Sequence, residues 1–316
     1  MSNPLLLIPH RVGPDRASAL RDELLEVLPE ADVRVTTTPA ETDELLPKAD
    51  GYVGYHLDAE ARERAANLRW IHVLSAGVDR YDLDAVADEG IVLTNSSGIH
   101  AEPIAEQVLW YMLTFERKMH VGQRQQADSH WERFEGGELR GKTVGIVGVG
   151  AIGGRIAELS SALGMTVIGT KRDTSETPDG VDELFGPDDL REVCHRADYL
   201  VLACPLTDET EDLIGWDELQ LLGGDGVLVN IARGGVVDED ALVRALTYHV
   251  VGGAALDVFE TEPLPKESTL WDLSNVVITP HMAGSNPNKV ERWTEILAEN
   301  YEVLASGDGE FRNRIV

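Results

Sequence analysis

Three polar residues in the second half of the chain each follow an apolar stretch that is typical of a buried strand. Arg233 comes after "VLVNIA", Glu262 after "ALDVFET" and His281 after "NVVITP". The carboxyl ends of parallel strands meet at one edge of a sheet, and open α/β sheets bind ligands at that edge. The spacing therefore predicts that an arginine, a glutamate and a histidine face a common ligand.

These side-chain types suit the reduction of a carbonyl group that lies next to a carboxylate. The planar guanidinium of Arg233 can bind the carboxylate through two hydrogen bonds and polarise the adjacent carbonyl. His281 can protonate the developing alkoxide. Glu262 can accept a hydrogen bond from the imidazole, and its charge should raise the pKa of His281. In the reverse direction, the neutral imidazole is the base.

A glycine-rich segment, "TVGIVGVGAIGGRIAEL", lies between an expected strand and an expected helix. Gly148, Gly150 and Gly153 form a G-x-G-x-x-G pattern. The first glycine permits a tight turn, the second lets the backbone approach a pyrophosphate, and the third lets the helix pack on the strand. The helix N-terminus adds N–H donors. This arrangement predicts a dinucleotide-binding site.

Lys171 and Arg172 stand at the end of the next expected strand, where an NAD-binding chain usually carries a carboxylate for the ribose 2′-hydroxyl. Two cations suit the 2′-phosphate of NADP instead, and Thr170 adds a hydroxyl donor. Asp173 favours the opposite interpretation, because its carboxylate would bind the ribose diol of NAD if the loop shifted. We predict that NADP(H) is preferred and NAD(H) is a second cofactor; a solvated charged turn is the alternative.

Short apolar runs alternate with amphipathic stretches over the first 98 residues and again from Val144 onward, a rhythm that is typical of parallel α/β sheets. Residues 100–126 are expected to form one long helix, and residues 289–307 the last helix. A chain of 316 residues is long enough for two doubly wound domains, since a domain usually has about 100–200 residues.

Composition limits the partners and the location. The chain has 27 basic and 56 acidic residues, a net charge of −29, which argues against nucleic-acid and anionic-membrane binding. Arginine outnumbers lysine, which favours adaptation to molar salt over an ordinary acidic cytosolic protein. No apolar run reaches the ~20 residues of a membrane span, and the start reads as a strand, so a cytoplasmic location is expected. Cys194 and Cys204 lack metal-ligand spacing, so no metal site is expected.

The motifs "GKTVGIVGVGAIG", "CPLTDET", "NIARGGVVDEDAL", "ALDVFETEPLP" and "NVVITPHMAG" carry a resemblance that covers nearly the whole chain. The chain resembles the D-isomer-specific 2-hydroxyacid dehydrogenases, and its acidic composition makes it most similar to a haloarchaeal member. The resemblance implies that Arg233, Glu262 and His281 form the catalytic triad. Formate-oxidising relatives usually have Gln where this chain has Glu262, so a formate substrate is disfavoured.

The resemblance also implies further site residues. Asp257 should contact the nicotinamide end, and the other cofactor-wall positions are Ala151, Ile152, Cys204, Pro205, Thr210 and Ile231. The amides of Ser75, Ala76 and Gly77 should hold the substrate carboxylate, and successive small residues suit such an anion-binding turn. Tyr55 and His56 are expected to face the cleft; a surface loop is the alternative for both.

The implied architecture is two doubly wound parallel-sheet (Rossmann-like) domains with a discontinuous substrate domain. The substrate domain comprises residues 1–98 and 287–316, and the coenzyme domain comprises residues 99–286, with hinges expected near Gly98 and Asn286. The expected function is an NADPH-preferring 2-oxo acid reductase, or D-2-hydroxyacid dehydrogenase, that forms a homodimer through the coenzyme domain. Alternatives are a specific glyoxylate/hydroxypyruvate reductase and a dinucleotide-sensing corepressor. Phosphoglycerate oxidation is disfavoured, because it usually comes with extra regulatory domains.

Overall fold

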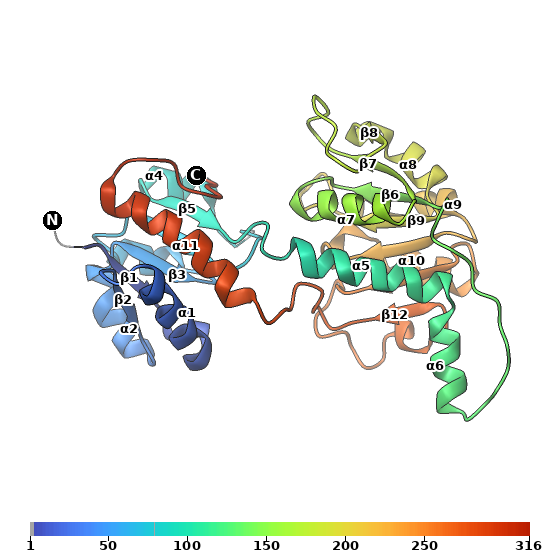
Figure 1. The fold of residues 1–316 in the computed structure, drawn as a ribbon, viewed down its shortest axis with the longest axis horizontal. Coiled ribbons are helices and arrows are strands. Elements are labelled where there is room, and N and C mark those ends of the chain that lie inside the picture. The colour runs from blue at the N-terminus through green and yellow to red at the C-terminus, as the bar shows by residue number, and fades with distance from the viewer. Residues whose placement is uncertain (1–2, 79) are drawn as a thin grey trace. The chain divides into compact units, whose positions relative to one another are not determined.

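The computed structural model describes residues 3–78 and 80–316, and the chain divides into two compact units (Figure 1). The terminal unit comprises residues 1–99 and 286–316, and the central unit comprises residues 100–285. The crossovers differ by one residue from the predicted positions. In the part of the chain that the structure describes, no helix is long and apolar enough to cross a bilayer.

The terminal unit is built on a parallel sheet with the strand order β2-β1-β3-β4-β5. Its strands are β1 (Leu5–Ile8), β2 (Asp32–Val35), β3 (Gly51–Gly54), β4 (Trp70–Val73) and β5 (Val92–Asn95). Its helices are α1 (Pro14–Val27), α2 (Pro39–Leu45), α3 (Ala59–Arg64), α4 (Leu83–Asp88) and α11 (Lys289–Ser306).

Helix α11 returns from the far end of the sequence to complete this unit. In Figure 1 it lies beside α1, so the red and blue ends of the chain pack together. Leu20 and Leu24 of α1 are fully buried in one cluster with Trp293 and Leu297 of α11. Helices α2, α3 and α4 cover a second apolar cluster. Both faces of the sheet are therefore covered, as a parallel sheet requires.

The central unit is built on a parallel sheet with the strand order β12-β11-β10-β9-β6-β7-β8. Its strands are β6 (Thr143–Val147), β7 (Thr166–Thr170), β8 (Glu183–Phe185), β9 (Tyr199–Leu202), β10 (Val227–Asn230), β11 (Gly253–Leu256) and β12 (Val276–Ile278). Its helices are α5 (Ala101–Glu116), α6 (Met119–Ala127), α7 (Ala151–Ala162), α8 (Leu190–Arg196), α9 (Trp216–Leu222) and α10 (Glu239–Thr247). Helices α5 and α7 pack on one apolar cluster and α8, α9 and α10 on another. The predicted fold class, two parallel-sheet α/β units, is confirmed.

The prediction of one helix over residues 100–126 is wrong. Helix α5 ends at Glu116, and α6 starts after Lys118, whose φ of 53° is left-handed. A later segment packs on the break: the Gly137 N–H donates to the Glu116 carbonyl at 2.8 Å, and a Cβ at Gly136 would lie 3.0 Å from the Arg117 Cα. The break depends on this tertiary contact, so the local helical pattern does not reveal it.

Candidate active site and dinucleotide pocket

Arg233, Glu262 and His281 follow three neighbouring strands of the central sheet, β10, β11 and β12. The last residues of these three strands are register partners across the sheet. The segments that carry the three side chains therefore leave the sheet from aligned positions at its carboxyl edge, which is the ligand-binding edge of an open α/β sheet.

His281 and Glu262 form a hydrogen-bonded pair. The imidazole Nδ1 lies 2.8 Å from Glu262 Oε2, and the other carboxylate oxygen accepts a hydrogen bond from the Phe259 N–H at 3.2 Å. The carboxylate is thus held in place while it orients the ring. The Nε2 atom has no hydrogen-bond partner within residues 3–78 and 80–316, and the His281 side chain is 52% exposed. Nε2 is therefore the ring atom available for proton transfer.

The turn that carries His281 is held by the buried carboxylate of Asp257. His281 has a φ of 48°, a left-handed conformation that a non-glycine residue rarely adopts. Its N–H donates to the Asp257 backbone carbonyl at 2.8 Å. The amides of Met282 and Ala283 donate to the two carboxylate oxygens of Asp257, each at 2.9 Å. Asp257 is 2% exposed, so these contacts stabilise the turn from inside the protein.

The half-buried Thr279 and the fully buried Tyr111 extend this network. The Thr279 hydroxyl donates to Asp257 Oδ1, and the same hydroxyl contacts the hydroxyl of Tyr111 in α5. Because the single Thr279 proton goes to the carboxylate, the Tyr111 phenol is the donor to Thr279. Burial raises the pKa of Tyr111, so the phenol keeps its proton. The sequence did not predict that Asp257, Thr279 and Tyr111 position His281.

Arg233 follows a tight turn that the side chain of Asn230 holds from both sides. Asn230 Oδ1 accepts the Ala232 N–H at 3.0 Å, and its Nδ2 donates to the Arg233 carbonyl at 3.0 Å. Asn230 is 1% exposed, whereas Arg233 is half-buried. The buried amide therefore fixes the point from which the guanidinium leaves the sheet.

A second candidate site lies at the switch point of the central sheet, where β6 has β7 on one side and β9 on the other. A cavity of about 340 Å³ lies there, after the carboxyl ends of these strands. It gathers eight of the predicted cofactor residues, namely Gly148, Gly150, Thr170, Lys171, Arg172, Cys204, Pro205 and Thr210. Its other walls are largely apolar, including Val149, Leu190 and Leu213. An apolar wall with polar groups at one edge fits an adenosine ring and its phosphates.

Two glycines of the predicted phosphate loop leave no space for a side chain. Gly148 has a φ of 97°, and a Cβ there would lie 2.8 Å from the Cys204 backbone. A Cβ at Gly153 would lie 2.3 Å from the Gly148 carbonyl oxygen. Gly150 caps the N-terminus of α7, and Ala151 and Ile152 form its first turn. The residues present therefore fit a pyrophosphate at this helix end.

The edge of this cavity carries the two predicted cations. The Lys171 side chain has no hydrogen bond or ion pair in the described part of the chain. Arg172 pairs with Glu209 at 3.2 Å, but both side chains are more than two-thirds exposed. Asp173 accepts the Ser175 N–H at 3.0 Å, and hydrogen bonds from Ser175, with Lys171 nearby, lower its pKa. Asp173 is thus already engaged with its own loop.

The remaining predicted cofactor residues have mainly structural contacts. Burial raises the pKa of Cys204, so its thiol stays protonated. The Thr210 hydroxyl accepts the Thr207 N–H at 2.8 Å and donates to the Pro205 carbonyl at 2.6 Å. Ile231 is 7% exposed in the apolar core.

In the terminal unit, the turn at Ser75, Ala76 and Gly77 follows β4. All three carbonyl oxygens have donors: the Ser96 N–H, the Asn95 side chain at 2.5 Å and the Ser75 hydroxyl at 2.9 Å. The three amides have no acceptor among the described residues, although Asp79 lies outside them. The turn can therefore present N–H groups to an anion. The sequence did not reveal the buried Asn95.

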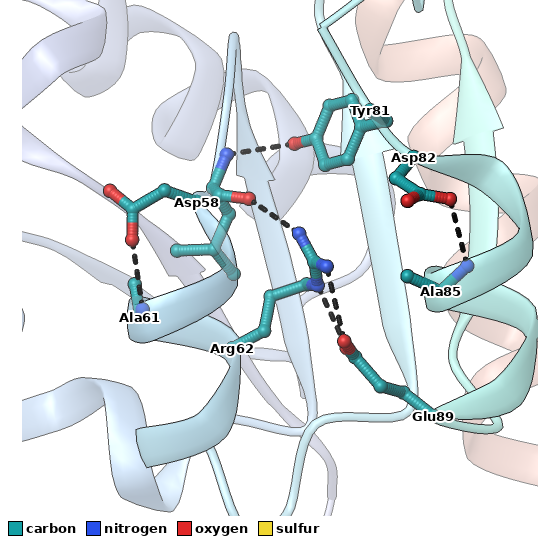
Figure 2. A network of polar contacts seen from close by, with 8 residues as sticks. Asp58, Ala61, Arg62, Tyr81, Asp82, Ala85 and Glu89 are labelled. Carbon is teal, nitrogen blue, oxygen red and sulfur yellow. Dashed lines mark hydrogen bonds and ion pairs between the residues drawn. The ribbon is translucent and has the colours of Figure 1, made fainter.

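Tyr55 and His56 follow β3 and point to different surroundings. The Tyr55 hydroxyl accepts a hydrogen bond from Arg16 at 2.9 Å, and its ring packs on the α1 and α11 cluster. His56 lines a cavity of its own. Figure 2 shows how the loop after His56 is held: the Leu57 N–H donates to the Tyr81 hydroxyl, and Arg62 donates to the Leu57 carbonyl.

Known proteins are similar to this chain in sequence and in fold. The family model of the D-isomer specific 2-hydroxyacid dehydrogenase NAD-binding domain matches residues 109–283. A glyoxylate reductase of Aeropyrum pernix is 32% identical, over 97% of this chain and 94% of that protein. A D-3-phosphoglycerate dehydrogenase of Methanocaldococcus jannaschii is 34% identical over 90% of this chain, which spans only 55% of that protein.

Solved structures extend the likeness to the whole chain. A D-isomer specific 2-hydroxyacid dehydrogenase family protein from Aeromonas salmonicida is 30% identical, with a TM-score of 0.86 over 100% of this chain and 99% of that one. The NADPH-dependent glyoxylate/hydroxypyruvate reductase of Sinorhizobium meliloti, in complex with NADP and sulfate, is 26% identical, with a TM-score of 0.83 over 99% and 98%. The chain therefore belongs to the D-isomer specific 2-hydroxyacid dehydrogenase family, a family of NAD(P)-dependent oxidoreductases.

Proposed function

We propose that this protein reduces small 2-oxo acids to D-2-hydroxy acids and prefers NADPH to NADH. The observation that carries the proposal is the His281–Glu262 pair, which leaves the imidazole Nε2 available at the sheet edge that also carries Arg233. An acid–base group beside a guanidinium is what the reduction of a carbonyl next to a carboxylate requires.

Each residue has one proposed task. The Arg233 guanidinium binds the substrate carboxylate and polarises the neighbouring carbonyl. The His281 imidazolium donates its Nε2 proton to the oxygen as negative charge develops there, while Glu262 keeps the ring oriented and stabilises its charge. A bound reduced nicotinamide supplies the hydride. In the reverse direction, neutral His281 accepts the hydroxyl proton. The amides of Ser75, Ala76 and Gly77 are the proposed carboxylate-binding element of the terminal unit.

The preference for NADP rests on Lys171, Arg172 and the engaged Asp173. The exposed Arg172–Glu209 pair is worth only about 0–1 kcal/mol. A charge-assisted hydrogen bond to a phosphate is worth about 1.5–3 kcal/mol, so the 2′-phosphate should displace Glu209. The NADP-bound relative from Sinorhizobium meliloti agrees with this proposal. In the Lys171→Ala, Arg172→Ala double variant, the ratio of kcat/KM for NADPH over NADH should fall by at least tenfold; an unchanged ratio would contradict the assignment.

Relatives named as glyoxylate or glyoxylate/hydroxypyruvate reductases point to a short substrate. The test is kcat/KM for glyoxylate, hydroxypyruvate, pyruvate and longer branched 2-oxo acids with both cofactors, followed by the absorbance of the reduced nicotinamide. We expect the highest values with NADPH and a two- or three-carbon acid. Tight NADPH binding with no turnover of any 2-oxo acid would favour a dinucleotide-sensing binding protein instead.

We also propose a homodimer formed through the central unit. Large apolar side chains are exposed on α5, α6 and the segment that follows, namely Trp110, Leu113, Met119, Trp131 and Phe134. Trp131 is 95% exposed, and Figure 1 shows α6 and this segment leading away from the sheet. Such a set of exposed apolar residues is typical of a covered interface. Light scattering should give twice the chain mass, and Trp131→Ser should lower it; a monomeric wild type would refute the proposal.

A further inference from the structure

A cavity of about 220 Å³ lies within the terminal unit, at the carboxyl ends of β1 and β3. The strand order β2-β1-β3-β4-β5 places the switch point of this sheet between those two strands. Open α/β sheets bind ligands in the crevice at such a point. His10 and Arg11 line the cavity from the segment after β1, and Tyr52 and His56 line it from β3 and the loop that follows.

Two groups that line the cavity have no partner among the residues that the structure describes. His56 Nδ1 is buried and has no hydrogen bond within residues 3–78 and 80–316. Arg11 forms no ion pair in the same part of the chain, although the protein as a whole has 56 acidic residues. The carboxylates that line the cavity are already engaged: Asp58 accepts the Ala61 N–H at 2.9 Å, and Asp43 pairs with Arg64 at 3.3 Å. The buried Nδ1 of His56 and the exposed guanidinium of Arg11 are therefore the lining groups that a negatively charged or accepting ligand could bind.

Burial is the largest cause that lowers the pKa of the His56 imidazole. Asp58 raises this pKa, whereas Arg80, Arg62 and Arg11 lower it. Figure 2 shows that Arg62 pairs with Glu89. The two hydrogen bonds of this pair measure 2.7 and 3.1 Å. Arg11 and Arg80 are left without carboxylate partners in the described part of the chain.

The other polar groups of the cavity are fixed by local contacts. His10 Nδ1 lies 2.8 Å from the Thr42 hydroxyl, which also contacts Thr36. The Tyr52 hydroxyl donates to the His56 carbonyl at 3.1 Å, and the Tyr81 ring packs edge-on against the His56 ring at a centroid distance of 5.0 Å. The imidazole of His56 is thus held in place while its Nδ1 lacks a partner, which is the arrangement of a preformed site.

We propose that this cavity binds a small oxyanion, a carboxylate or phosphate group, between the Arg11 guanidinium and the protonated imidazole of His56. The volume is below the roughly 300–1,000 Å³ of a site for a drug-sized ligand, so it suits an acid of a few heavy atoms rather than a nucleotide. The proposal goes beyond the dehydrogenase function and does not depend on it.

Binding should be linked to the protonation of His56. An anion within hydrogen-bond distance of Nδ1 favours the imidazolium, and burial and the nearby arginines oppose it in the free protein. The complex should therefore take up a proton, and affinity should rise as the pH falls toward the imidazole pKa of the complex. The charged groups that act on the imidazole are Asp58, Arg80, Arg62 and Arg11. His10 is a second imidazole that lines the cavity, so the His56 signal itself must be followed.

The test is a titration of histidine-labelled protein with inorganic phosphate or with acetate, at constant ionic strength set by KCl, followed by the ring NMR signal of His56. The His56→Gln variant identifies that signal. We expect a saturable shift with at least one of the two anions and proton uptake on binding. A response to phosphate alone assigns a phosphate ligand, and a response to acetate alone a carboxylate ligand.

Three variants make the result specific. Arg11→Gln should weaken binding by roughly tenfold, the loss expected for one charge-assisted contact. Arg34→Gln, at an exposed arginine of the same unit that does not line the cavity, should leave affinity unchanged. Arg233→Gln removes the guanidinium of the candidate active site, and the His56 response must persist in it. No His56 response to either anion, or an unchanged affinity in Arg11→Gln, would overturn the proposal.

Discussion

The substitution Thr279→Val tests whether the hydrogen-bond network that holds the His281 turn controls catalysis. It keeps the shape of the side chain and removes the hydroxyl that donates to Asp257 and accepts from Tyr111. The Tyr111 phenol then loses Thr279 as an acceptor, and the Asp257 carboxylate loses one of its three donors. The turn keeps its amide contacts but loses the link to α5.

The magnitude follows from two opposing terms. A hydrogen bond to a charged group is worth about 1.5–3 kcal/mol. A non-glycine residue in the left-handed conformation, here His281, costs about 1–2 kcal/mol. The free energy of the lost hydrogen bond is as large as the cost of the left-handed conformation of His281, which the network compensates. The productive position of His281 should therefore no longer be strongly favoured. We expect kcat with glyoxylate and NADPH to fall roughly 10- to 150-fold.

The assay is steady-state turnover as a function of pH, combined with urea unfolding of the same preparation. The KM for NADPH should stay unchanged, because the dinucleotide pocket lies at β6, β7 and β9. Thr279→Ser is the matched control, since it retains the hydroxyl, and it should keep most of the activity. The reasoning is refuted if Thr279→Val turns over within twofold of the wild type, or if the Ser and Val variants are equally impaired.

Three more predictions follow from the structure and composition. His281→Ala should lower kcat by at least about 100-fold, the lower end for loss of a general acid, and near-normal turnover would exclude its role. Burial lowers the pKa of His72 to about 3. Between about pH 6.5 and pH 3 the unfolded state therefore binds one more proton than the folded state. The contribution of neutral His72 to folding stability is lost as the pH falls through that window. The difference in unfolding free energy between pH 5 and pH 7, measured with urea, should therefore be about 2 kcal/mol smaller in His72→Gln; an equal difference would refute this. With a net charge of −29, the protein should unfold and lose activity on dialysis from molar salt, where the Debye length is about 3 Å, into dilute buffer, and full activity there would remove the high-salt interpretation.

The sequence was sufficient for features that depend on local pattern. Strand–helix alternation predicted two parallel α/β sheets. The G-x-G-x-x-G pattern predicted the tight loop in which Gly148 lies against the Cys204 backbone. Each signal is contained in a short stretch, because strand burial and glycine conformation are set by near neighbours. The haloarchaeal source suggested by the composition stays a prediction.

Features that depend on distant contacts could not be predicted. The break between α5 and α6 needs Gly136 and Gly137 to pack on the helix end. The sequence predicted Asp257 as a cofactor contact. In the structure its carboxylate accepts hydrogen bonds from amides of the turn after β12, and these amides lie more than twenty residues away in sequence. No periodicity encodes such a pairing, since it arises only when two neighbouring strands bring their ends together.

The return of α11 to the terminal unit has a consequence for biosynthesis. The apolar stripe of α1, with Leu20 and Leu24, is synthesised before the central unit, whereas Trp293 and Leu297, which cover it, emerge after the central unit. A nascent chain must therefore carry an incomplete first core while nearly two hundred intervening residues are synthesised and fold. Such a surface is prone to aggregation, so the incomplete terminal unit should depend on chaperones until α11 leaves the ribosome.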